Sequence, residues 1–221
     1  MLQQINKKIL LYFFIFIILG TFNNKNLKEF NLPKINSLKI NGLEIDQKFS
    51  EKLEILKIDN IFFIDKIKTK ELFNSNNLIE EYEIFKKYPM SLEIEIVGTK
   101  FLAQTNIDGK FFLIGSNGKL IENKNNTNSL PYIFGDLDIN NFFNLKKIID
   151  ESSLNFQEIK NLYFFPSGRW DLETLSDVQI KLPKERLKES LNLSLDLLNN
   201  EKFDNIKLID VRQKNQVIIN D

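Results

Sequence analysis

The N-terminal segment restricts this chain more than any later motif does. Lys7 and Lys8 precede an uncharged, largely apolar run, residues 9–22. As a helix, this run would extend roughly 21 Å, less than the ~30 Å hydrocarbon core of a bilayer. A helix that begins at Ile5 would extend about 27 Å, with both lysine side chains reaching toward the headgroups. The segment therefore predicts a single transmembrane anchor at 9–22.

Two other interpretations of residues 9–22 remain open. A cleaved signal peptide requires small residues after the apolar run, and Phe22 does not suit such a site. A buried core helix would be equally apolar. Lysines lie on both sides of the run, so charge gives only a weak orientation. Because residues 1–8 are too few to form a domain, we expect them to be a cytoplasmic tail. The bulk of the chain then lies on the periplasmic side of the inner membrane.

The overall composition excludes several classes of function. The 221 residues include 30 basic and 30 acidic side chains, so the formal net charge is zero. No concentrated basic surface for nucleic acid is expected. The sequence has no Cys and no His, which removes thiol nucleophiles, disulfides, Ser-His-Asp triads and zinc sites made of imidazole or thiolate. We expect no catalytic residue, no metal, no cofactor and no small-molecule substrate.

Periodicity and turn signals divide the remainder into a linker and two domains. Residues 23–34 are polar and predict the linker. The first domain is expected at 35–99. Its elements are a strand at 37–40, an amphipathic helix at 46–57, a helix capped by Asp65, and strands at 79–85 and 91–96.

A second, β-rich domain is expected at 100–221. Its elements are strands near 101–105, 110–114 and 119–121 with turns at Gly109 and Gly118, a loop at 130–135, a helix at 140–149, a meander at 159–164, 170–175 and 178–182, a helix at 184–199, and closing strands at 205–212 and 216–219. The chain is thus predicted to be an α+β protein, with an antiparallel sheet and two helices in this domain.

These segments, in this order and spacing, resemble the FtsQ/DivIB family of bacterial cell-division proteins. The motifs that carry the resemblance are Ile35 to Gly42, Phe63-Ile64-Asp65, Tyr88-Pro89 with Leu92-Glu93-Ile94, Leu113-Ile114 with Gly118, Leu130-Pro131 with Gly135, Arg169-Trp170 with Val178 to Leu182, and Ile209-Asp210-Val211-Arg212. Two positions depart from the family pattern. Gly115 stands where the family usually has Asp, and Gln213 stands where it usually has Tyr.

The resemblance implies a fold and a function. The fold would be an anchor, a POTRA domain of strand, two helices and two strands at 35–99, and a partner-binding β domain at 100–221. The function would be that of a non-catalytic scaffold that recruits divisome proteins of the FtsB/FtsL type at the septum. The family Tyr that Gln213 replaces lies in the surface that binds these partners, so this contact is expected to be built differently here.

The final strand is the best candidate for a binding site. An apolar closing strand with one unpaired side can add a strand of a partner to its sheet, with main-chain hydrogen bonds giving affinity. The candidate partner-binding residues are Arg212, Gln213, Gln216, Val217, Ile218, Ile219 and Trp170. The alternatives are a buried terminal strand, a local ion pair at Arg212, and core packing at Trp170.

Two other functions remain open. An envelope hydrolase would need one carboxyl with a raised pKa beside one that stays ionised. The candidate acids are Glu80, Glu81, Glu83, Glu93, Glu95, Asp136 and Asp138, and strand alternation favours a solvated face for Glu93 and Glu95. The other possibility is a POTRA-bearing envelope assembly factor, although such proteins usually repeat the module or continue into a large barrel.

Overall fold

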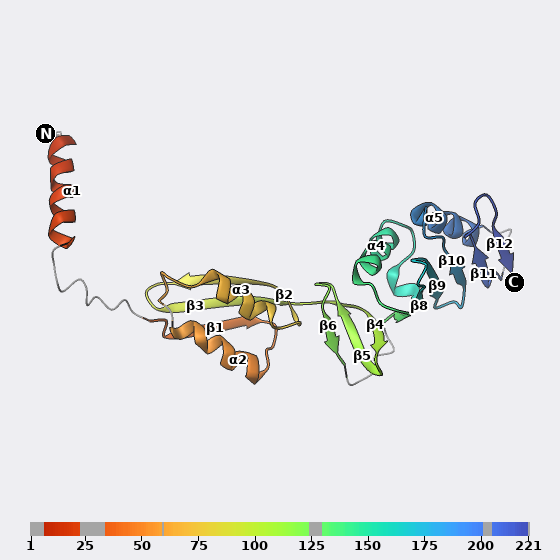
Figure 1. Cartoon of the computed structure of the whole chain (residues 1–221), viewed down its shortest axis with the longest axis horizontal. Coiled ribbons are helices and arrows are strands. Elements are labelled where there is room, and N and C mark those ends of the chain that lie inside the picture. The colour runs from red at the N-terminus through yellow and green to blue at the C-terminus, as the bar shows by residue number, and fades with distance from the viewer. Residues whose placement is uncertain (1–6, 23–33, 59, 124–129, 201–204, 221) are drawn as a thin grey trace. The chain divides into compact units, whose positions relative to one another are not determined.

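The computed structural model describes residues 7–22, 34–58, 60–123, 130–200 and 205–220 (Figure 1). The chain divides into two compact units. The first unit comprises Met1–Asn41, Ile45–Lys70 and Ile84–Ile94. The second unit comprises Gly42–Glu44, Glu71–Glu83 and Glu95–Asp221. The expected domain boundary after residue 99 stays a prediction.

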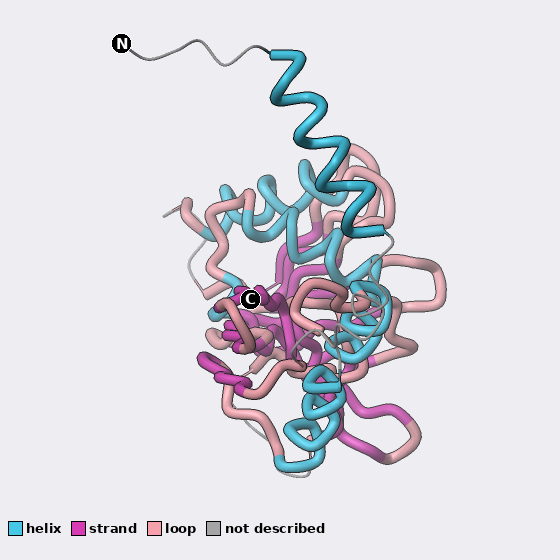
Figure 2. Tube along the Cα trace, turned by 90° about the vertical axis from the view of Figure 1, so that its left-hand side faces the viewer, coloured by secondary structure: helices cyan, strands magenta, loops and turns pink. Residues whose placement is uncertain are grey.

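The first described element is the helix α1, Lys7–Phe22 (Figure 2, cyan). Its apolar side chains from Ile9 to Leu19 are exposed. Within the described ranges, no helix combines the length and the apolar character that crossing a bilayer requires. The proposed extension to Ile5 and residues 23–33 of the linker expected at 23–34 lie outside the described residues.

The order of elements up to residue 98 agrees with the prediction. It comprises β1 (Ser37–Gly42), α2 (Gln47–Leu53), the 3-10 helix η2 (Glu54–Ile58), α3 (Lys66–Asn74), β2 (Ile79–Lys87) and β3 (Ser91–Gly98). The three strands form one sheet in the order β1-β3-β2. The helix expected at 46–57 is α-helical only to Leu53 and continues as η2.

Side-chain caps fix where the two helices begin. The Asp46 carboxylate accepts a hydrogen bond from the Phe49 amide at 2.8 Å. Asp65 accepts bonds from the amides of Ile67 and Lys68, at 2.9 and 3.1 Å, as expected of an N-cap residue. The buried apolar side chains of the first unit are Ile35, Phe49, Leu53, Leu56, Ile61, Leu92 and Ile94.

The second unit contains a nine-stranded sheet in the order β12-β11-β10-β9-β8-β7-β4-β5-β6. Its strands are β4 (Phe101–Ile107), β5 (Lys110–Gly115), β6 (Leu120–Glu122), β7 (Tyr132–Phe134), β8 (Ile159–Phe164), β9 (Trp170–Thr174), β10 (Gln179–Lys181), β11 (Leu208–Asp210) and β12 (Ile218–Asn220). The helices are α4 (Ile139–Asp150), η3 (Phe156–Glu158) and α5 (Leu187–Leu198).

Two expectations for this sheet were wrong. The sheet is mixed rather than antiparallel, because β7 pairs in parallel with β4 and β8, and β10 pairs in parallel with β11. The parallel pair β10–β11 is connected through α5, which lies between them in sequence and provides the crossover that parallel strands require. The segment 130–135 is not only a loop, because its residues 132–134 form β7 in the middle of the sheet.

One face of this sheet packs on the helices. The core includes Phe142, Leu145 and Ile149 of α4 and Leu191 and Leu195 of α5, together with sheet residues such as Ile133, Leu162, Leu172, Ile180 and Ile209. By strand alternation, the neighbours of these sheet residues lie on the other face. That other face carries most of the charged side chains discussed below.

Candidate partner-binding edge

The strand β12 is the last strand at one end of the nine-stranded sheet. It pairs antiparallel with β11 in the register Asp210↔Ile218, Ile209↔Ile219 and Leu208↔Asn220. Among the described residues, no strand pairs with its other side. At the opposite end of the sheet, the carbonyl of Leu120 in β6 accepts a hydrogen bond from the Asn77 side chain at 2.9 Å. The two ends therefore differ, and β12 offers the less occupied edge.

The closing residues divide between the two faces of the sheet. Val217 and Ile219 are half-buried and pack against the core. Ile218 is 46% exposed. Gln213 and Gln216 are exposed and lie outside the strand, on either side of a turn in which Asn215 has φ 62°. The strand is thus fixed by two apolar side chains and presents one, Ile218.

Charged residues cross the sheet beside Ile218. The register places Ile218 opposite Asp210, Asp210 beside Lys181, and Lys181 opposite Asp171. Register partners lie on the same face of a sheet. A partner strand at β12 would therefore join a face that already carries alternating charge.

Arg212 is bound by its own chain. Its Nε donates to both carboxyl oxygens of Asp210, at 2.8 and 3.0 Å, and its Nη2 donates to Oδ2. The main-chain N–H of Arg212 donates to the same carboxylate at 3.1 Å. Hydrogen bonds from this guanidinium lower the pKa of Asp210, and the Asp210 carboxylate in turn raises the pKa of Arg212. The local ion pair, one of the two interpretations of Arg212, is the arrangement found.

A second arginine–aspartate pair lies at the start of β9. Arg169 directly precedes this strand, and Asp171 is its second residue. Arg169 Nε lies 3.6 Å from Asp171 Oδ1, beyond normal hydrogen-bond length, and both atoms are buried without a hydrogen-bond partner in the described residues. The Arg169 guanidinium instead lies 4.0 Å over the Phe165 ring. Burial raises the pKa of Asp171. Sequence inspection did not single out Asp171, because its burial depends on the strand register.

Trp170 does not belong to the surface of this edge. Its side chain is 2% exposed, it is part of the core, and its ring centroid lies 4.6 Å from that of Phe164. A binding role for Trp170 is therefore not supported, because the alternation of β9 directs the side chain toward the helices.

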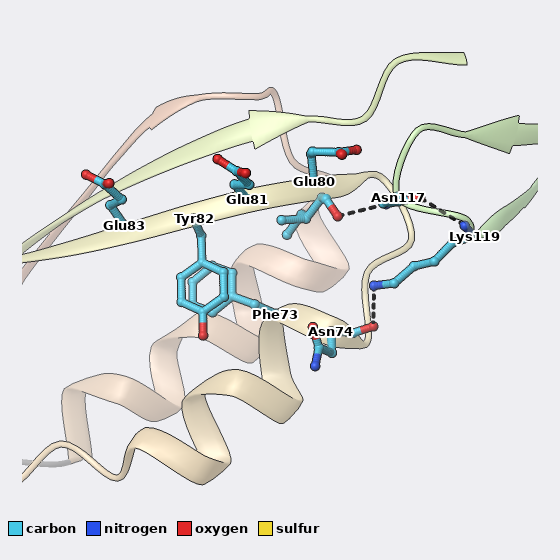
Figure 3. Close-up of a pocket in the computed structure, with 9 residues that line it drawn as sticks. Phe73, Asn74, Glu80, Glu81, Tyr82, Glu83, Asn117 and Lys119 are labelled. Carbon is cyan, nitrogen blue, oxygen red and sulfur yellow. Dashed lines mark hydrogen bonds between the residues drawn. The ribbon is translucent and has the colours of Figure 1, made fainter. Parts of the chain in front are cut away.

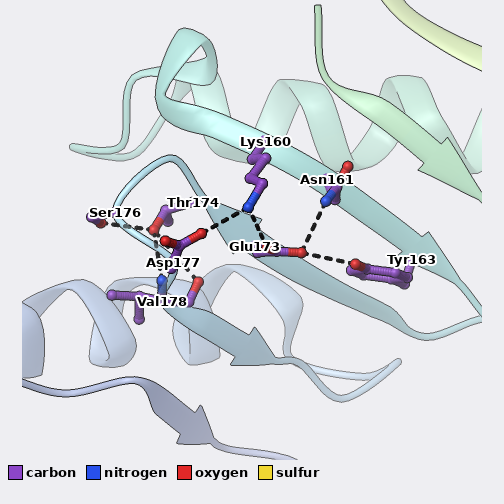
Figure 4. Close-up of polar contacts among 8 residues, drawn as sticks. All are labelled: Lys160, Asn161, Tyr163, Glu173, Thr174, Ser176, Asp177 and Val178. Atoms are coloured by element: carbon purple, nitrogen blue, oxygen red, sulfur yellow. Dashed lines mark hydrogen bonds and ion pairs between the residues drawn. The ribbon is translucent and has the colours of Figure 1, made fainter. Parts of the chain in front are cut away.

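Strands β8 and β9 carry a polar network on their exposed face (Figure 4). The Glu173 carboxylate accepts hydrogen bonds from Asn161 at 2.9 Å and Tyr163 at 2.8 Å and pairs with Lys160 at 3.0 Å. Lys160 also binds Asp177 at 2.7 Å. The side-chain hydrogen bond from Asn161 is the largest cause of the lowered pKa of Glu173. This carboxylate is held ionised by its partners, which suits a structural role.

The carboxylates considered for a hydrolase are spread over several elements. Glu80, Glu81 and Glu83 line a pocket of about 570 Å³ along β2, and Figure 3 shows Glu81 and Glu83 on the opposite side of the strand from Tyr82. Asp138 caps α4 by accepting from the Asn141 amide at 3.1 Å. Asp136 lies in the turn before that cap, and Glu95 is an exposed residue of β3.

Glu93 is in a basic setting. Hydrogen bonds from Lys39, Asn41 and Lys87 lower its pKa to about 2, the reverse of what a general acid needs. Asp171 and Asp210 do have pKa values shifted in opposite directions, but they are only 3% and 8% exposed. Neither carboxyl is presented to a substrate.

Comparison with known proteins agrees with the resemblance found in the sequence. The model of the family "Cell division protein FtsQ/DivIB, C-terminal" matches residues 103–212. A cell division protein DivIB of Clostridium botulinum (strain Loch Maree) is 26% identical over 225 residues, which cover 93% of this chain and 86% of that protein. The chain belongs to the FtsQ/DivIB family.

Two more distant relatives were found. The cell division protein FtsQ of Rickettsia bellii is 24% identical over 173 residues, covering 76% of this chain and 64% of that protein. The solved extracytoplasmic domain of DivIB from Geobacillus stearothermophilus has a TM-score of 0.33 and 14% identity, covering 42% of this chain and 85% of that chain. A TM-score this low adds nothing to the assignment.

Membership of the FtsQ/DivIB family makes this chain a cell-division protein of the divisome. The family match ends at Arg212, so β12 lies just beyond the matched residues. A Cβ at Gly115 would lie 2.6 Å from both Asn117 Oδ1 and Thr99 Oγ1, so a larger residue there would require these two side chains to move.

Proposed function

We propose that this chain is a non-catalytic, membrane-anchored scaffold that holds other divisome proteins through the open edge of β12. Its family consists of non-enzymatic cell-division scaffolds, which supports the general role. The observation that carries the specific site is the position of β12, paired with β11 on one side and with no described strand on the other.

The mechanism is strand addition. The main chain of β12 offers donors and acceptors to an extended segment of a partner, and these bonds give affinity whatever the partner's side chains are. Specificity comes from side chains at alternate positions. Ile218 would pack against a residue of the incoming strand, because directly opposite residues have Cβ atoms about 5 Å apart. Val217 and Ile219 secure the strand from the other face.

The partners we propose are divisome membrane proteins of the FtsB/FtsL type, bound at the septum on the periplasmic side. Gln213 and Gln216 flank the strand and are exposed, so they are placed to contact the ends of a bound segment. Arg212 contributes by holding Asp210 ionised beside Ile218. The domain at 35–99, which we assign as POTRA-like, serves recruitment.

The anchor belongs to the same proposal. The helix α1 is formed by uncharged residues after Lys8, and its apolar side chains are exposed. Exposed side chains of this kind require an apolar environment. With residues 1–8 in the cytoplasm, the helix would hold the two units at the periplasmic surface.

The test is a substitution at Ile218, because its side chain is 46% exposed and a charge there leaves the core intact. Val217 is less suitable since it packs against the core. We expect Ile218→Lys to abolish recovery of FtsB/FtsL-type proteins in a pull-down from cells while the melting temperature does not fall, because Asp210 lies opposite position 218 and would not repel a lysine. Leu193→Lys on α5 is the matched control, because Leu193 is 45% exposed. Undiminished recovery with Ile218→Lys would contradict the proposed site.

A further inference from the structure

Four large apolar side chains of the first unit are exposed near one another: three lie within the six residues 62–67, and the fourth, Tyr88, contacts Phe62. Phe62 is 52% exposed, Phe63 73%, Ile67 73% and Tyr88 62%. The ring centroids of Phe62 and Tyr88 lie 5.4 Å apart, which joins the turn before α3 to the turn between β2 and β3. These four residues are called the apolar cluster here. Clustered exposed apolar side chains on a soluble unit indicate an interaction surface.

The turn that carries Phe62 and Phe63 is closed by hydrogen bonds to Asn60. Asn60 accepts hydrogen bonds from the amide of Phe62 through its side chain and from the amide of Phe63 through its carbonyl, both at 2.9 Å. Ile61 is fully buried and fixes the turn to the unit. The hydrogen bonds of this turn therefore hold Phe62 and Phe63 in positions where their side chains are exposed.

The chain from α1 enters the first unit beside this cluster. Lys34 forms an antiparallel bridge with Asn60, the residue that shapes the turn. The amides of Asn36 and Ser37 donate to the carbonyl of Met90, at 2.8 and 3.3 Å, close in sequence to Tyr88. Eleven residues lie between Phe22 and Lys34, so the connection can span at most about 40 Å. The apolar cluster is thus at the end of the unit that is tethered to α1.

The charges around the cluster are mainly basic. Three exposed lysines lie near its members. Lys66 and Lys86 are close to them in sequence, and the bridge to Asn60 brings Lys34 near the turn. Of the described acids near the cluster, Asp65 caps α3, and the exposed Glu71 lies one helical turn beyond Ile67. Aromatic and aliphatic side chains among lysines are characteristic of surfaces that lie in the headgroup region of anionic membranes.

We infer that the apolar cluster inserts into the outer surface of the bilayer that holds α1, with Phe62, Phe63 and Ile67 among the headgroups and acyl-chain ends. The flanking lysines contact anionic lipid. This inference rests on the anchor proposed above, because α1 brings the first unit within reach of the lipid. The contact would fix the orientation of this unit relative to the membrane while leaving the β12 edge to proteins.

The experiment uses the full chain in nanodiscs that contain phosphatidylglycerol and a lipid with a nitroxide near its headgroup. Phe63→Trp places an indole in the cluster, and the native Trp170 is buried and supplies a constant background. Ile67→Trp repeats the measurement from α3. Leu175→Trp is the control, because Leu175 is 64% exposed in the second unit.

We expect the indoles at positions 63 and 67 to shift to shorter emission wavelength and to lose about half of their emission to the nitroxide, as for a side chain at the interface. The indole at position 175 should keep its emission. A chain that incorporates into nanodiscs but shows no quenching at 63 and 67 overturns the membrane contact and leaves the cluster to a protein partner. A chain that does not incorporate at all overturns the anchor, and the inference with it.

Discussion

Truncation of Arg212 tests whether this side chain stabilises the fold. Arg212→Ala removes the side-chain bonds to Asp210 and leaves that carboxylate, 8% exposed, with the main-chain N–H as its remaining described donor. A charge-assisted hydrogen bond contributes about 1.5–3 kcal/mol. Because the Arg212 side chain is 36% exposed, water recovers part of this. We expect the free energy of unfolding to fall by about 1–2 kcal/mol.

The assay is urea unfolding of the full chain in detergent, monitored by Trp170 fluorescence and by circular dichroism. Lys188→Ala is the control and should have no measurable effect, because Lys188 pairs with Glu151 at 2.8 Å on the open surface. The pKa of Asp210 is lowered in the folded state. The stabilisation is therefore complete above the ordinary Asp pKa and is lost as pH falls through the lowered value. Equal stability of Arg212→Ala and the parent at neutral pH, or a difference that persists in acid, would refute this reasoning.

Three further substitutions have definite outcomes in the same unfolding assay. Asn117→Ala removes two hydrogen bonds of 2.9 Å to main-chain carbonyls at the start of β2, so the free energy of unfolding should fall by about 2 kcal/mol. A fall of less than ~0.5 kcal/mol would contradict this. Gly135→Ala would place a Cβ 2.0 Å from the Phe164 carbonyl oxygen, at a residue with φ 101°, so we expect the free energy of unfolding to fall by about 3 kcal/mol. For Gly109→Ala we expect a fall of only about 1 kcal/mol, because the added Cβ would meet nothing within 4 Å. Glu93→Gln should remove a stabilisation that the parent keeps above pH 4.5 and loses as pH falls toward about 2; stability curves that stay parallel through this range would show that Glu93 has no such role.

The elements with long periodic patterns could be predicted from the sequence, whereas β7 could not. The helices α4 and α5 and the strand β3 each repeat their apolar residues often enough to show a period. The strand β7 has three residues between Pro131 and Gly135, which read as turn signals. It is a strand because β4 and β8 supply main-chain partners on both sides. No local property of the sequence predicts these two pairings.

The direction of strand pairing, parallel or antiparallel, could not be predicted from the sequence either. The segments of β10 and β11 each have the composition of a strand, but their parallel pairing depends on α5 crossing over the sheet. The closing strand was expected from its apolar residues, and its place at the end of the sheet follows from this topology.

At the candidate site, the sequence could single out residues by their type and motif, but it could not predict which contacts they make. Arg212 could be singled out by its motif, but the local pair with Asp210 depends on the backbone geometry after β11. The same holds for Trp170, whose face of β9 is set by the register with β8. A single sequence shows which residues alternate and does not show which alternate face the helices will cover.

The central claim concerns the main chain of β12, so amide hydrogen exchange tests it most directly. The exchange of the full chain would be measured alone and with the periplasmic part of an FtsB/FtsL-type protein. We predict that amides at 218–220 exchange more slowly in the complex, while those of β6 at 120–122 are unchanged. A complex that forms with no slowing at β12 would contradict the account.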